Sequence, residues 1–547
     1  MGIGMHQAGQ SRGGLPIPSR PVRAHAVHPH PDRMTTVGRY HLGRLAEQSF
    51  ERRGDYPALL FQGRWHTSGE LFSRAQRVAA GFAELGIAPG DRVVITMANC
   101  PEVAVAYQAL WLAGAVVTPA MFLLPAADLR HVIADAQASA VVATPEFVPK
   151  VLEATEGLEH VRALICTEAG EDRLLPLASV EQAQPRPVVP RADDDLAALL
   201  YTGGTTGRAK GVMLSHANLY FSGQAAHQAA HVPGVNRALT TLPLSHAYGL
   251  LVTIAAMHNP ERGISVLLRW FDPEAFLDLV GEHQLQISAV VPTMLQILLA
   301  APLEDYSLSS LRYVTSGGAP LPREVEQEFC RRVPSVSIRQ GYGLTETAAL
   351  ISTNPVGAER PGSVGRPVPG TQIEIRDDEG HVLPAGDAGE VCCRSPGVMQ
   401  GYWHAPDATA AALRGGWLHT GDIGYLDDDG YLFIVDRKKD LIIRGGFNVY
   451  PRDVEDVLVE HPAVQMAAVV GRPSERHGEE VVAFVSLAAG AEVTPDELVK
   501  WARDRIGGYK YPREVHVLDA IPLTPVGKID RKAVRSRATE PAGDAAA

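Results

Sequence analysis

Cysteine is scarce in this chain, and the cysteines that are present lack the spacing of a metal site. The sequence has 547 residues and five cysteines, which are Cys100, Cys166, Cys330, Cys392 and Cys393. An odd number of scattered cysteines is typical of proteins in a reducing compartment. We therefore expect a cytoplasmic protein.

An excess of positive charge and a long uninterrupted apolar segment are also absent. The net charge is −12, so nucleic acid is not expected as the main partner, and any basic site must be local. Residues 103–127 carry no charge and could span a bilayer, but Gly114, Pro119 and Pro125 interrupt them. We interpret this stretch as a helix capped by Asn99, a glycine stop and a short buried strand. No transmembrane segment is expected, whereas peripheral membrane contact stays open.

Apolar, strand-like runs alternate with amphipathic helical runs over residues 40–435. This alternation predicts an α/β fold with doubly wound sheets of βα units. After Gly362 the pattern changes to short strands and turns, among which Asp429 and Gly430 give a hairpin signal, so a small β-rich subdomain is expected. Beyond the charged residues 436–440 lies an α+β pattern, in which Thr494 and Glu497 predict a capping box.

The charged interruption at residues 436–440 is the predicted domain boundary. The first 33 residues are rich in proline, arginine and histidine and lack the apolar run of a signal peptide. These features predict four segments: a disordered extension over 1–39, a large α/β domain over 40–436, a smaller α+β domain over 437–532 and a tail over 533–547.

A loop of glycines and threonines, YTGGTTGRAKG, follows one of the apolar runs at residues 201–211. Consecutive glycines and hydroxyl residues can turn backbone N–H groups around an anion, and Lys210 would add a positive charge. The common P-loop places its lysine directly after glycine, whereas Lys210 lies between Ala209 and Gly211. A flexible glycine-rich turn is the alternative, but the hydroxyls and the lysine favour a phosphate site.

A second motif is QGYGLTET at residues 340–347. Tyr342, between two glycines, offers a flat ring beside open backbone, which suits a stacked base. Thr345 and Glu346 offer oxygen atoms, the ligands that Mg²⁺ prefers. Taken alone, the motif could equally be an ordinary turn before a helix.

Two further motifs lie near the C-terminus. Asp422 follows TG in a tight turn and could accept hydrogen bonds from two ribose hydroxyls, and Arg437 stands at the end of the next hairpin strand. Lys528 lies in the proline- and glycine-rich stretch PLTPVGKIDRK. Taken singly, a plain turn aspartate and two exposed cations are the better interpretations.

Together and in this order, the four motifs resemble the adenylate-forming superfamily of acyl-CoA synthetases, aryl-CoA ligases, luciferases and peptide-synthetase adenylation domains. The resemblance covers about residues 40–532, although Gly204 and Ala209 stand where the family often has serine and proline. It implies an adenylation, or AMP-binding, domain over 40–436 and a mobile C-terminal domain over 437–532.

The resemblance implies a site for ATP and Mg²⁺. The implied triphosphate contacts are Thr202, Gly203, Gly204, Thr205, Thr206, Gly207 and Lys210. The implied adenine slot is formed by Gly318, Ala319, Pro320 and Tyr342, and Gly341 and Gly343 are further implied ATP- or AMP-binding residues. Asp422 matches the ribose ligand with Arg437 beside it, and Thr345 and Glu346 match the phosphate and Mg²⁺ positions.

The resemblance also implies a lysine that acts in catalysis and a second pose of the small domain. Lys528 matches the catalytic lysine, and a positioned cation reduces the repulsion between a carboxylate and the α-phosphate that it attacks. Lys439 matches the hinge. Arg444, Gly445 and Gly446 match a CoA-binding loop, where glycine lets the thin pantetheine arm pass close to the backbone.

The acid substrate is predicted from LPLSHAYGL at residues 242–250. His246 matches a catalytic position at the pocket entrance, and Ala247 stands about where amino-acid-activating domains have an aspartate. A buried unpaired ammonium is costly, so a non-amino acid is expected. The implied pocket residues are His246, Tyr248, Thr293, Ser316 and Gly317. The motif RGGFNVYP looks most like fatty-acyl and medium-chain ligases, while an aryl or polyketide-like acid stays possible.

The sequence thus predicts an ATP-dependent acyl-CoA synthetase that forms an acyl-adenylate and passes the acyl group to CoA. Its expected small-molecule partners are a carboxylic acid, ATP and CoA. One alternative is an enzyme that loads an acyl carrier protein, and another is a non-catalytic acyl- or nucleotide-binding homologue. Both a monomer and a homodimer remain open.

Overall fold

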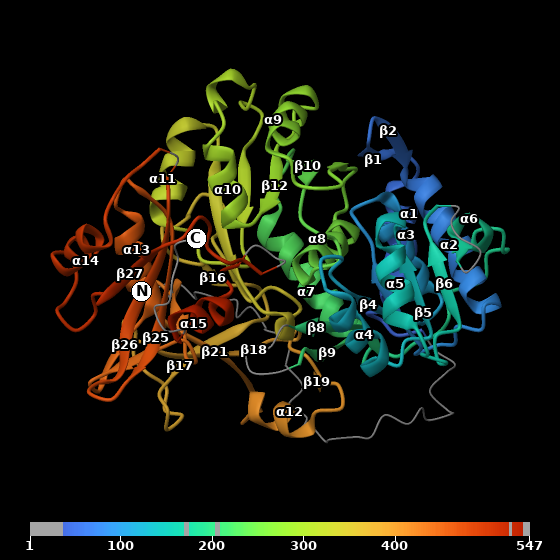
Figure 1. Ribbon diagram of the computed structural model, residues 1–547. Coiled ribbons are helices and arrows are strands. Elements are labelled where there is room, and N and C mark those ends of the chain that lie inside the picture. Colours follow the sequence, from blue (N-terminus) through green and yellow to red (C-terminus); the bar gives the residue numbers. More distant parts are fainter. Residues whose placement is uncertain (1–36, 169–173, 203–207, 489, 525–527, 540–547) are drawn as a thin grey trace, which may run out of the picture.

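The computed structural model describes residues 37–168, 174–202, 208–488, 490–524 and 528–539. The elements of the large domain run from the blue helices at one side of Figure 1 to the yellow and green sheet at its centre, and the red and orange C-terminal elements lie at the other side. The predicted extension therefore falls almost wholly outside the described residues. The mixed α/β fold with a large and a smaller domain confirms the predicted fold class.

An eight-stranded sheet, in the order β19-β9-β8-β4-β3-β5-β6-β7, forms one half of the large domain. Its strands are β3 (Arg92–Thr96), β4 (Val116–Pro119), β5 (Ala140–Ala143), β6 (Ala163–Cys166), β7 (Leu175–Pro176), β8 (Leu196–Thr202), β9 (Lys210–Ser215) and β19 (Gly401–Tyr402). The helices of this half are α1 (Leu42–Arg53), α2 (Ser68–Glu84), α3 (Pro101–Leu112), α4 (Ala126–Asp135), α5 (Val148–Thr155) and α6 (Leu177–Val180).

A nine-stranded sheet, in the order β16-β15-β14-β13-β12-β10-β11-β1-β2, forms the other half. Its strands are β1 (Pro57–Phe61), β2 (Arg64–Thr67), β10 (Arg237–Thr240), β11 (Ile264–Leu267), β12 (Ile287–Val290), β13 (Tyr313–Ser316), β14 (Ser337–Tyr342), β15 (Ser352–Thr353) and β16 (Arg366–Pro367). The helices of this half are α7 (His216–Ala230), α8 (Ala247–His258), α9 (Pro273–Glu282), α10 (Pro292–Leu299) and α11 (Arg323–Arg332).

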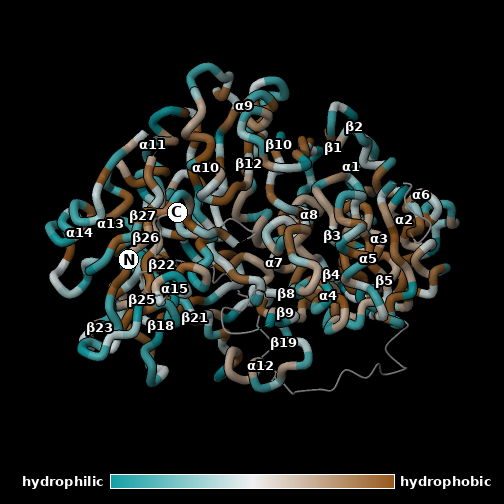
Figure 2. The backbone as a smooth tube through the Cα atoms, viewed as in Figure 1, coloured by the Kyte–Doolittle hydropathy of each residue, from teal (hydrophilic) through white to brown (hydrophobic). Residues whose placement is uncertain are grey.

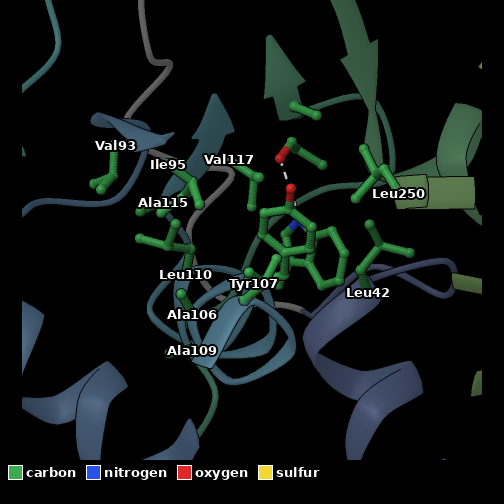
Figure 3. Packing of buried hydrophobic residues seen from close by; sticks show 14 of the residues in the cluster. Leu42, Val93, Ile95, Ala106, Tyr107, Ala109, Leu110, Ala115, Val117 and Leu250 are labelled. Atoms are coloured by element: carbon green, nitrogen blue, oxygen red, sulfur yellow. Dashed lines mark hydrogen bonds between the residues drawn. The ribbon is translucent and has the colours of Figure 1, made fainter. Parts of the chain in front are cut away.

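The eight-stranded sheet is covered by helices on both faces, and the nine-stranded sheet is covered on its outer face. Buried side chains of α1, α2, α3, α7 and α8 pack in one core with β3, β4 and β8, while α4 and α5 cover the opposite face of that sheet. Helices α9, α10 and α11 pack on the outer face of the nine-stranded sheet. Figure 3 shows Tyr107 among Leu42, Leu110 and Leu250 in the central core, where its hydroxyl donates to Leu244 O at 2.9 Å.

The β-rich subdomain and the smaller domain follow along the chain. The subdomain contains β17 (Gln372–Arg376), β18 (Gly389–Arg394), α12 (Pro406–Ala412), β20 (Leu413–Arg414), β21 (Trp417–Leu426) and β22 (Leu432–Arg437). The smaller domain contains β23 (Ile442–Arg444), β24 (Phe447–Val449), α13 (Pro451–Val459), β25 (Val464–Ser474), β26 (Gly478–Leu487), α14 (Pro495–Arg503), β27 (Glu514–Val517) and α15 (Arg531–Thr539). Apolar residues follow its inner strands while polar residues cover its periphery (Figure 2).

Several local predictions can be compared with these elements. The hairpin at Gly430, which has a φ of 77°, joins β21 to β22, and the capping box of Thr494 and Glu497 begins α14, as predicted. The predicted tail is wrong in its first part, because α15 extends to Thr539. Val534 and Ala538 of α15 are buried against β25 and β26, and this packing orders the segment.

The uncharged stretch at residues 103–127 forms most of α3, then β4 and the start of α4, as the glycine and proline interruptions predicted. Within the described ranges, none of the helices combines the length and apolarity that a membrane crossing requires. The prediction that Asn99 caps α3 is wrong, because Cys100 is the N-cap residue of this helix. The Asn99 amide instead donates to the carbonyls of Leu242 and Leu268 and accepts from Leu244 N, so it fixes the loop before α8. A cytoplasmic location stays a prediction.

Two stacked histidines are buried where α1 meets α7. The rings of His41 and His216 have centroids 4.4 Å apart, and the two residues are 1% and 0% exposed. His41 Nδ1 accepts from Arg44 N and caps α1, while His216 Nδ1 accepts from Leu42 N. Burial is the main reason that the pKa of His41 falls to about 4 and that the pKa of His216 falls well below its ordinary value.

We expect His41→Asn to make the protein less sensitive to acid. An imidazole whose pKa falls from 6.5 to about 4 on folding is protonated mainly in the unfolded state between these pH values. Stability therefore decreases as the pH is lowered through this window, by about 2 kcal/mol between pH 7 and pH 5 for one such group. Asparagine keeps a capping oxygen but does not titrate.

Urea unfolding at about pH 7 and about pH 5 measures this difference. The loss on acidification should be smaller in His41→Asn than in the wild type by about 2 kcal/mol. The control is His404→Asn at an exposed position, which should keep the wild-type pH dependence. Equal losses in wild type and His41→Asn would contradict the prediction.

Candidate functional site

A large cavity, with a volume of about 1260 Å³, lies between the two large sheets and the smaller domain. The carboxyl ends of parallel strands open into it, which is where α/β folds bind ligands. The residues at or just after these ends that line it are Pro119 of β4, Thr202 of β8, Thr240 of β10, Gly317 after β13 and Tyr342 of β14. The predicted motifs therefore meet here although they lie far apart in the sequence.

Tyr342, Asp422 and Arg437 form a hydrogen-bonded row at one side of the cavity. The Tyr342 hydroxyl donates to Oδ2 of Asp422 at 2.6 Å, and Nε of Arg437 lies 3.3 Å from Oδ1 of the same carboxylate. Asp422 and Arg437 are cross-strand partners in β21 and β22, and Asp422 is 5% exposed. Burial and then the Asp422 carboxylate raise the pKa of Tyr342. The row holds a flat ring and a carboxylate in fixed positions beside open space.

The other predicted nucleotide-binding residues near Tyr342 also line the cavity. They are Gly318, Ala319, Pro320, Gly341 and Gly343. Gly318 has a φ of 83°, a left-handed conformation that favours glycine. A Cβ atom on Gly343 would lie 2.4 Å from Ala349 O, so no side chain fits there. Their nucleotide contacts stay a prediction.

Glu346 lies on the one-turn helix η4 (Thr345–Thr347) and is joined to Lys210 through an aromatic ring. Its Oε1 accepts from the Tyr402 hydroxyl at 2.8 Å, and Lys210 Nζ lies 5.2 Å from the centroid of the Tyr402 ring. Thr345, Glu346, Lys210 and Tyr402 all line the cavity. Tyr402 was not predicted from the sequence, because its position in the cavity depends on the pairing of β19 with β9.

The two ends of the glycine- and threonine-rich loop lie at the cavity. Thr202 and Lys210 are cross-strand partners at the ends of β8 and β9, and both line the cavity. The predicted phosphate contacts between them lie outside the described residues; they are Gly203, Gly204, Thr205, Thr206 and Gly207. The loop therefore begins and ends at the position that its proposed role requires.

Lys528 enters the cavity from the smaller domain. Its ammonium interacts electrostatically with the Asp422 and Glu346 carboxylates and is repelled by the Arg437 and Lys439 cations. Burial, followed by Arg437, lowers the pKa of Lys528 to about 8, while the two carboxylates act in the opposite direction. Lys210 lines the cavity as well, so these cations and the two carboxylates surround the same space.

The segment between the domains is held by buried interactions of Asp436, which was not predicted from the sequence. Asp436 accepts hydrogen bonds from the backbone N–H groups of Arg437 and Arg452, at 2.7 and 2.9 Å. Burial raises the pKa of Asp436 to about 6. Lys439 follows in the chain and lines the cavity, and burial and then Arg437 lower its pKa. The hinge role of Lys439 stays a prediction.

His246 lies between Lys528 and the more apolar part of the cavity. Its Nδ1 accepts from Tyr248 N at 3.2 Å, so the imidazole caps α8. Burial and then Lys528 lower the pKa of His246 to about 4, which keeps the ring neutral near pH 7. A neutral, fixed imidazole at this place is suited to positioning a substrate carboxylate, and its catalytic role stays a prediction.

The apolar part of the cavity contains most of the predicted acyl-pocket residues. Tyr248, Thr293 and Gly317 line it, and the Tyr248 hydroxyl lies 3.0 Å from Thr315 Oγ1. Ser316 does not line it, because successive strand side chains point to opposite faces and Thr315 is the residue that faces the cavity. Small and apolar side chains complete the wall: Ala226, Ala229, Ala230, Leu251, Val252 and Ala255.

The predicted CoA-binding loop is a tight turn away from the cavity. Gly445 and Gly446 connect β23 to β24 with φ values of 58° and 82°, and neither they nor Arg444 line the cavity. Arg444 pairs with Glu480 instead. Phe447, directly after the turn, is 58% exposed. In this arrangement of the domains Lys528 lies inside the cavity and the glycine turn lies outside.

A magnesium ion would have Glu346 as its main protein ligand. In the part of the chain that the structure describes, no three or more histidine, cysteine or acidic side chains form a metal-binding group. Mg²⁺ is usually held by one or two carboxylates together with substrate phosphates, so a single carboxylate with the Thr345 hydroxyl beside it fits this ion. The donor set is therefore compatible with magnesium that arrives with ATP.

Two family models match the chain. Residues 46–403 match the model described as AMP-binding enzyme, and residues 453–528 match the AMP-binding enzyme C-terminal domain. The chain belongs to the AMP-binding enzymes. Tyr342 lies within the first matched range, whereas Asp422 and Arg437 lie between the two matched ranges.

Named relatives and solved structures of AMP-binding enzymes are similar over nearly the whole chain. A feruloyl-CoA synthase from Amycolatopsis is 38% identical over 86% of this chain and 94% of its own length. A long-chain-fatty-acid–CoA ligase from Bacillus subtilis is 35% identical over 91% of this chain and 95% of its own. The crystal structure of ATP-bound MatB from Rhodopseudomonas palustris is 31% identical, with a TM-score of 0.83 over 90% of this chain and 98% of that chain.

Proposed function

We propose that this AMP-binding enzyme is an ATP-dependent acid–CoA ligase that releases AMP and pyrophosphate. The observation that carries the proposal is that Lys528 lines the same cavity as Asp422 and Glu346 and interacts electrostatically with their carboxylates. The relatives named as a CoA synthase and a CoA ligase support the same activity. In this proposal the ribose binds at Asp422, adenine lies against Tyr342, and the triphosphate lies between Thr202 and Lys210.

The first proposed step forms an acyl-adenylate. A carboxylate oxygen attacks the α-phosphorus of ATP, the bond from that phosphorus to the bridging oxygen breaks, and pyrophosphate leaves. The Lys528 ammonium reduces the repulsion between carboxylate and phosphate and stabilises the charge that develops in the transition state. Magnesium held by Glu346 and the phosphates would neutralise charge on the leaving pyrophosphate.

The second proposed step transfers the acyl group to a thiol. The sulfur of CoA attacks the carbonyl carbon, the bond from that carbon to the phosphate oxygen of AMP breaks, and AMP leaves with the thiol proton released to solvent. We propose that the small domain turns at Lys439 for this step, so that the Gly445–Gly446 turn replaces Lys528. The exposed position of that turn, next to the exposed Phe447, supports a second pose.

The proposed acid lacks an amino group. Ala247 is buried at the start of α8 and brings no carboxylate to pair with an ammonium, and unpaired charge is costly to bury. The apolar side chains of α7 and α8 suit an alkyl or aryl tail. Fatty, medium-chain and aryl acids are therefore the proposed substrates.

The alternatives concern the acceptor and the chemistry. An enzyme that loads an acyl carrier protein would use the same turn for the same pantetheine arm. A non-catalytic binding homologue would not need Lys528, Glu346 and Asp422 to line one cavity, as they do here. The acceptor and the oligomeric state, monomer or homodimer, stay predictions.

Pyrophosphate release with a panel of carboxylic acids tests the proposed function. We expect release that depends on both ATP and acid, and AMP release that increases on addition of CoA. Parallel reactions with a phosphopantetheinylated carrier protein separate the two acceptors. Absence of pyrophosphate release across fatty, medium-chain and aryl acids would favour the non-catalytic homologue.

A further inference from the structure

The face of the nine-stranded sheet that lines the cavity carries a charged residue in an otherwise neutral row. The strand register places Thr240, Ala289, Thr315 and Arg339 side by side on β10, β12, β13 and β14. All four line the cavity. Their neighbours on the opposite face, such as Val314 and Ile338, belong to the core under α9, α10 and α11. The row is therefore the floor of the cavity, and Arg339 stands at its end.

Arg339 is buried and only partly satisfied. It is 1% exposed, and its Nε and Nη2 donate to Asn354 O at 3.1 and 2.8 Å. Nη2 also donates to Ala229 O, at 2.6 Å, in the last turn of α7. Its Nη1 has no hydrogen-bond acceptor among the described residues. These carbonyl contacts hold the guanidinium in one place and leave Nη1, which is itself buried, without an acceptor among the described residues.

The charge of Arg339 is not neutralised by a close carboxylate. Among the described residues, the hydrogen-bond partners of Arg339 are backbone carbonyls, and Glu359 interacts with it electrostatically without an ion pair. Burial lowers the pKa of Arg339, but a guanidinium remains protonated at any physiological pH. An N–H donor of a buried cation that stays unpaired is costly, and the cost is removed when an acceptor binds.

Near Arg339, the cavity wall contains a small polar group surrounded by apolar side chains. The Tyr248 hydroxyl, which bonds Thr315, interacts electrostatically with Arg339. The helices that face it contribute alanine, leucine and valine. The polar group lies on the sheet side of the cavity, whereas Lys528 enters from the smaller domain, so a bound acid whose carboxylate meets Lys528 would direct its tail toward the sheet.

We infer that Arg339 is a specificity-determining residue whose Nη1 donates a hydrogen bond to an oxygen atom in the tail of the acid. This inference rests on the proposed ligase function. It names the substrate class as acids with a phenol, alkoxy, carbonyl or second carboxylate oxygen distant from the reacting carboxyl group. A plain hydrocarbon tail of the same length leaves the donor unpaired. Sites built around a polar contact reject analogues that lack it more strongly than apolar pockets discriminate by size.

Matched pairs of acids test the inference in the wild-type enzyme. Suitable pairs are cinnamate with 4-hydroxycinnamate, and octanoate with 8-hydroxyoctanoate and octanedioate, and the measured quantity is kcat/KM for pyrophosphate release. We expect the oxygen-bearing member of at least one pair to be preferred by about 10- to 100-fold. Equal values within every pair, or preference for the unsubstituted acids, would overturn the inference while the ligase function stands.

Arg339→Met tests the residue itself. We expect the preference within a pair to fall to about threefold or less, because the variant loses the donor and keeps an apolar tail contact. A purely structural loss would lower both members of a pair equally. Arg312→Met, an exposed position just before β13, should keep the wild-type ratio. A preference that persists in Arg339→Met would overturn the inference.

Failure of the variant to fold and failure of the proposed function can both be distinguished from failure of the inference. If Arg339→Met does not fold, because the carbonyls of Asn354 and Ala229 lose their donors, the wild-type ratios decide alone. If no acid of any pair supports pyrophosphate release, the proposed function fails, and the inference about the acid tail fails with it.

Discussion

Lys528→Ala should slow acyl-adenylate formation by about 10²- to 10³-fold, the usual effect of removing one electrostatic contact to a transition state. Thiolysis of supplied acyl-adenylate by CoA should stay within about threefold of the wild type. The two half-reactions separate because Lys528 lies in the cavity beside Asp422 and Glu346, whereas the Gly445–Gly446 turn lies outside it. Stopped assays of pyrophosphate release and of thioester formation measure the two rates.

The matched control for this prediction is Lys500→Ala. Lys500 is an exposed lysine on α14 of the same domain and does not line the cavity. Both half-reactions should keep their wild-type rates in this variant. Equal losses of both half-reactions in Lys528→Ala would refute the proposal that the small domain uses a different pose for each step.

The pH dependence of the reaction gives a second test of the role of Lys528. Burial and the nearby Arg437 lower its pKa to about 8, so the cation becomes neutral as the pH rises through that value. The profile of kcat/KM reports ionisations of the free enzyme. We therefore expect kcat/KM for pyrophosphate release to decrease above about pH 8. Lys528→Ala should lose this decrease together with most of its activity.

The sequence allowed the fold to be predicted where hydrophobic patterns are local. Alternating apolar and amphipathic runs gave the two doubly wound sheets, and the turn at Asp429 and Gly430 gave the hairpin that joins β21 to β22. Cap positions were less predictable. Asn99 is a good capping residue, but its side-chain amide bonds three backbone groups of two distant loops, and these long-range bonds replace the local cap.

The candidate site was predictable only as far as its motifs extend. Tyr342, Asp422 and Lys528 were found because each belongs to a short recognisable stretch. Tyr402 was not found, because its contact with Glu346 spans 56 positions and depends on β19 joining the edge of a sheet. Arg339 lies one residue before a motif, and its burial and unpaired nitrogen depend on the packing of α7 and β15 against β14.

Arg531→Met should be the most destabilising substitution that we propose. Arg531 begins α15 and donates to both oxygens of Glu455, at 2.5 and 3.0 Å, and to Val469 O at 2.8 Å. Removing one partner from a buried ion pair typically costs about 3–5 kcal/mol, since the remaining charge stays buried. Lys528 lies three positions before Arg531, so pyrophosphate release should decrease as well. Urea unfolding of the small domain measures the loss of stability.

The control, Arg535→Met, tests whether burial causes the effect. Arg535 pairs with Asp440 at 3.4 Å, but its side chain is 42% exposed, so its loss should cost less than about 1 kcal/mol. Arg531 is also the main group that opposes the burial effect on the pKa of Asp436, which lies near 6. Without Arg531 that pKa rises further, so the folded state retains its proton to higher pH, and the stability of Arg531→Met should decrease more steeply above about pH 6 than that of the wild type. Similar losses in the two arginine variants would show that the buried network does not anchor the segment that carries Lys528.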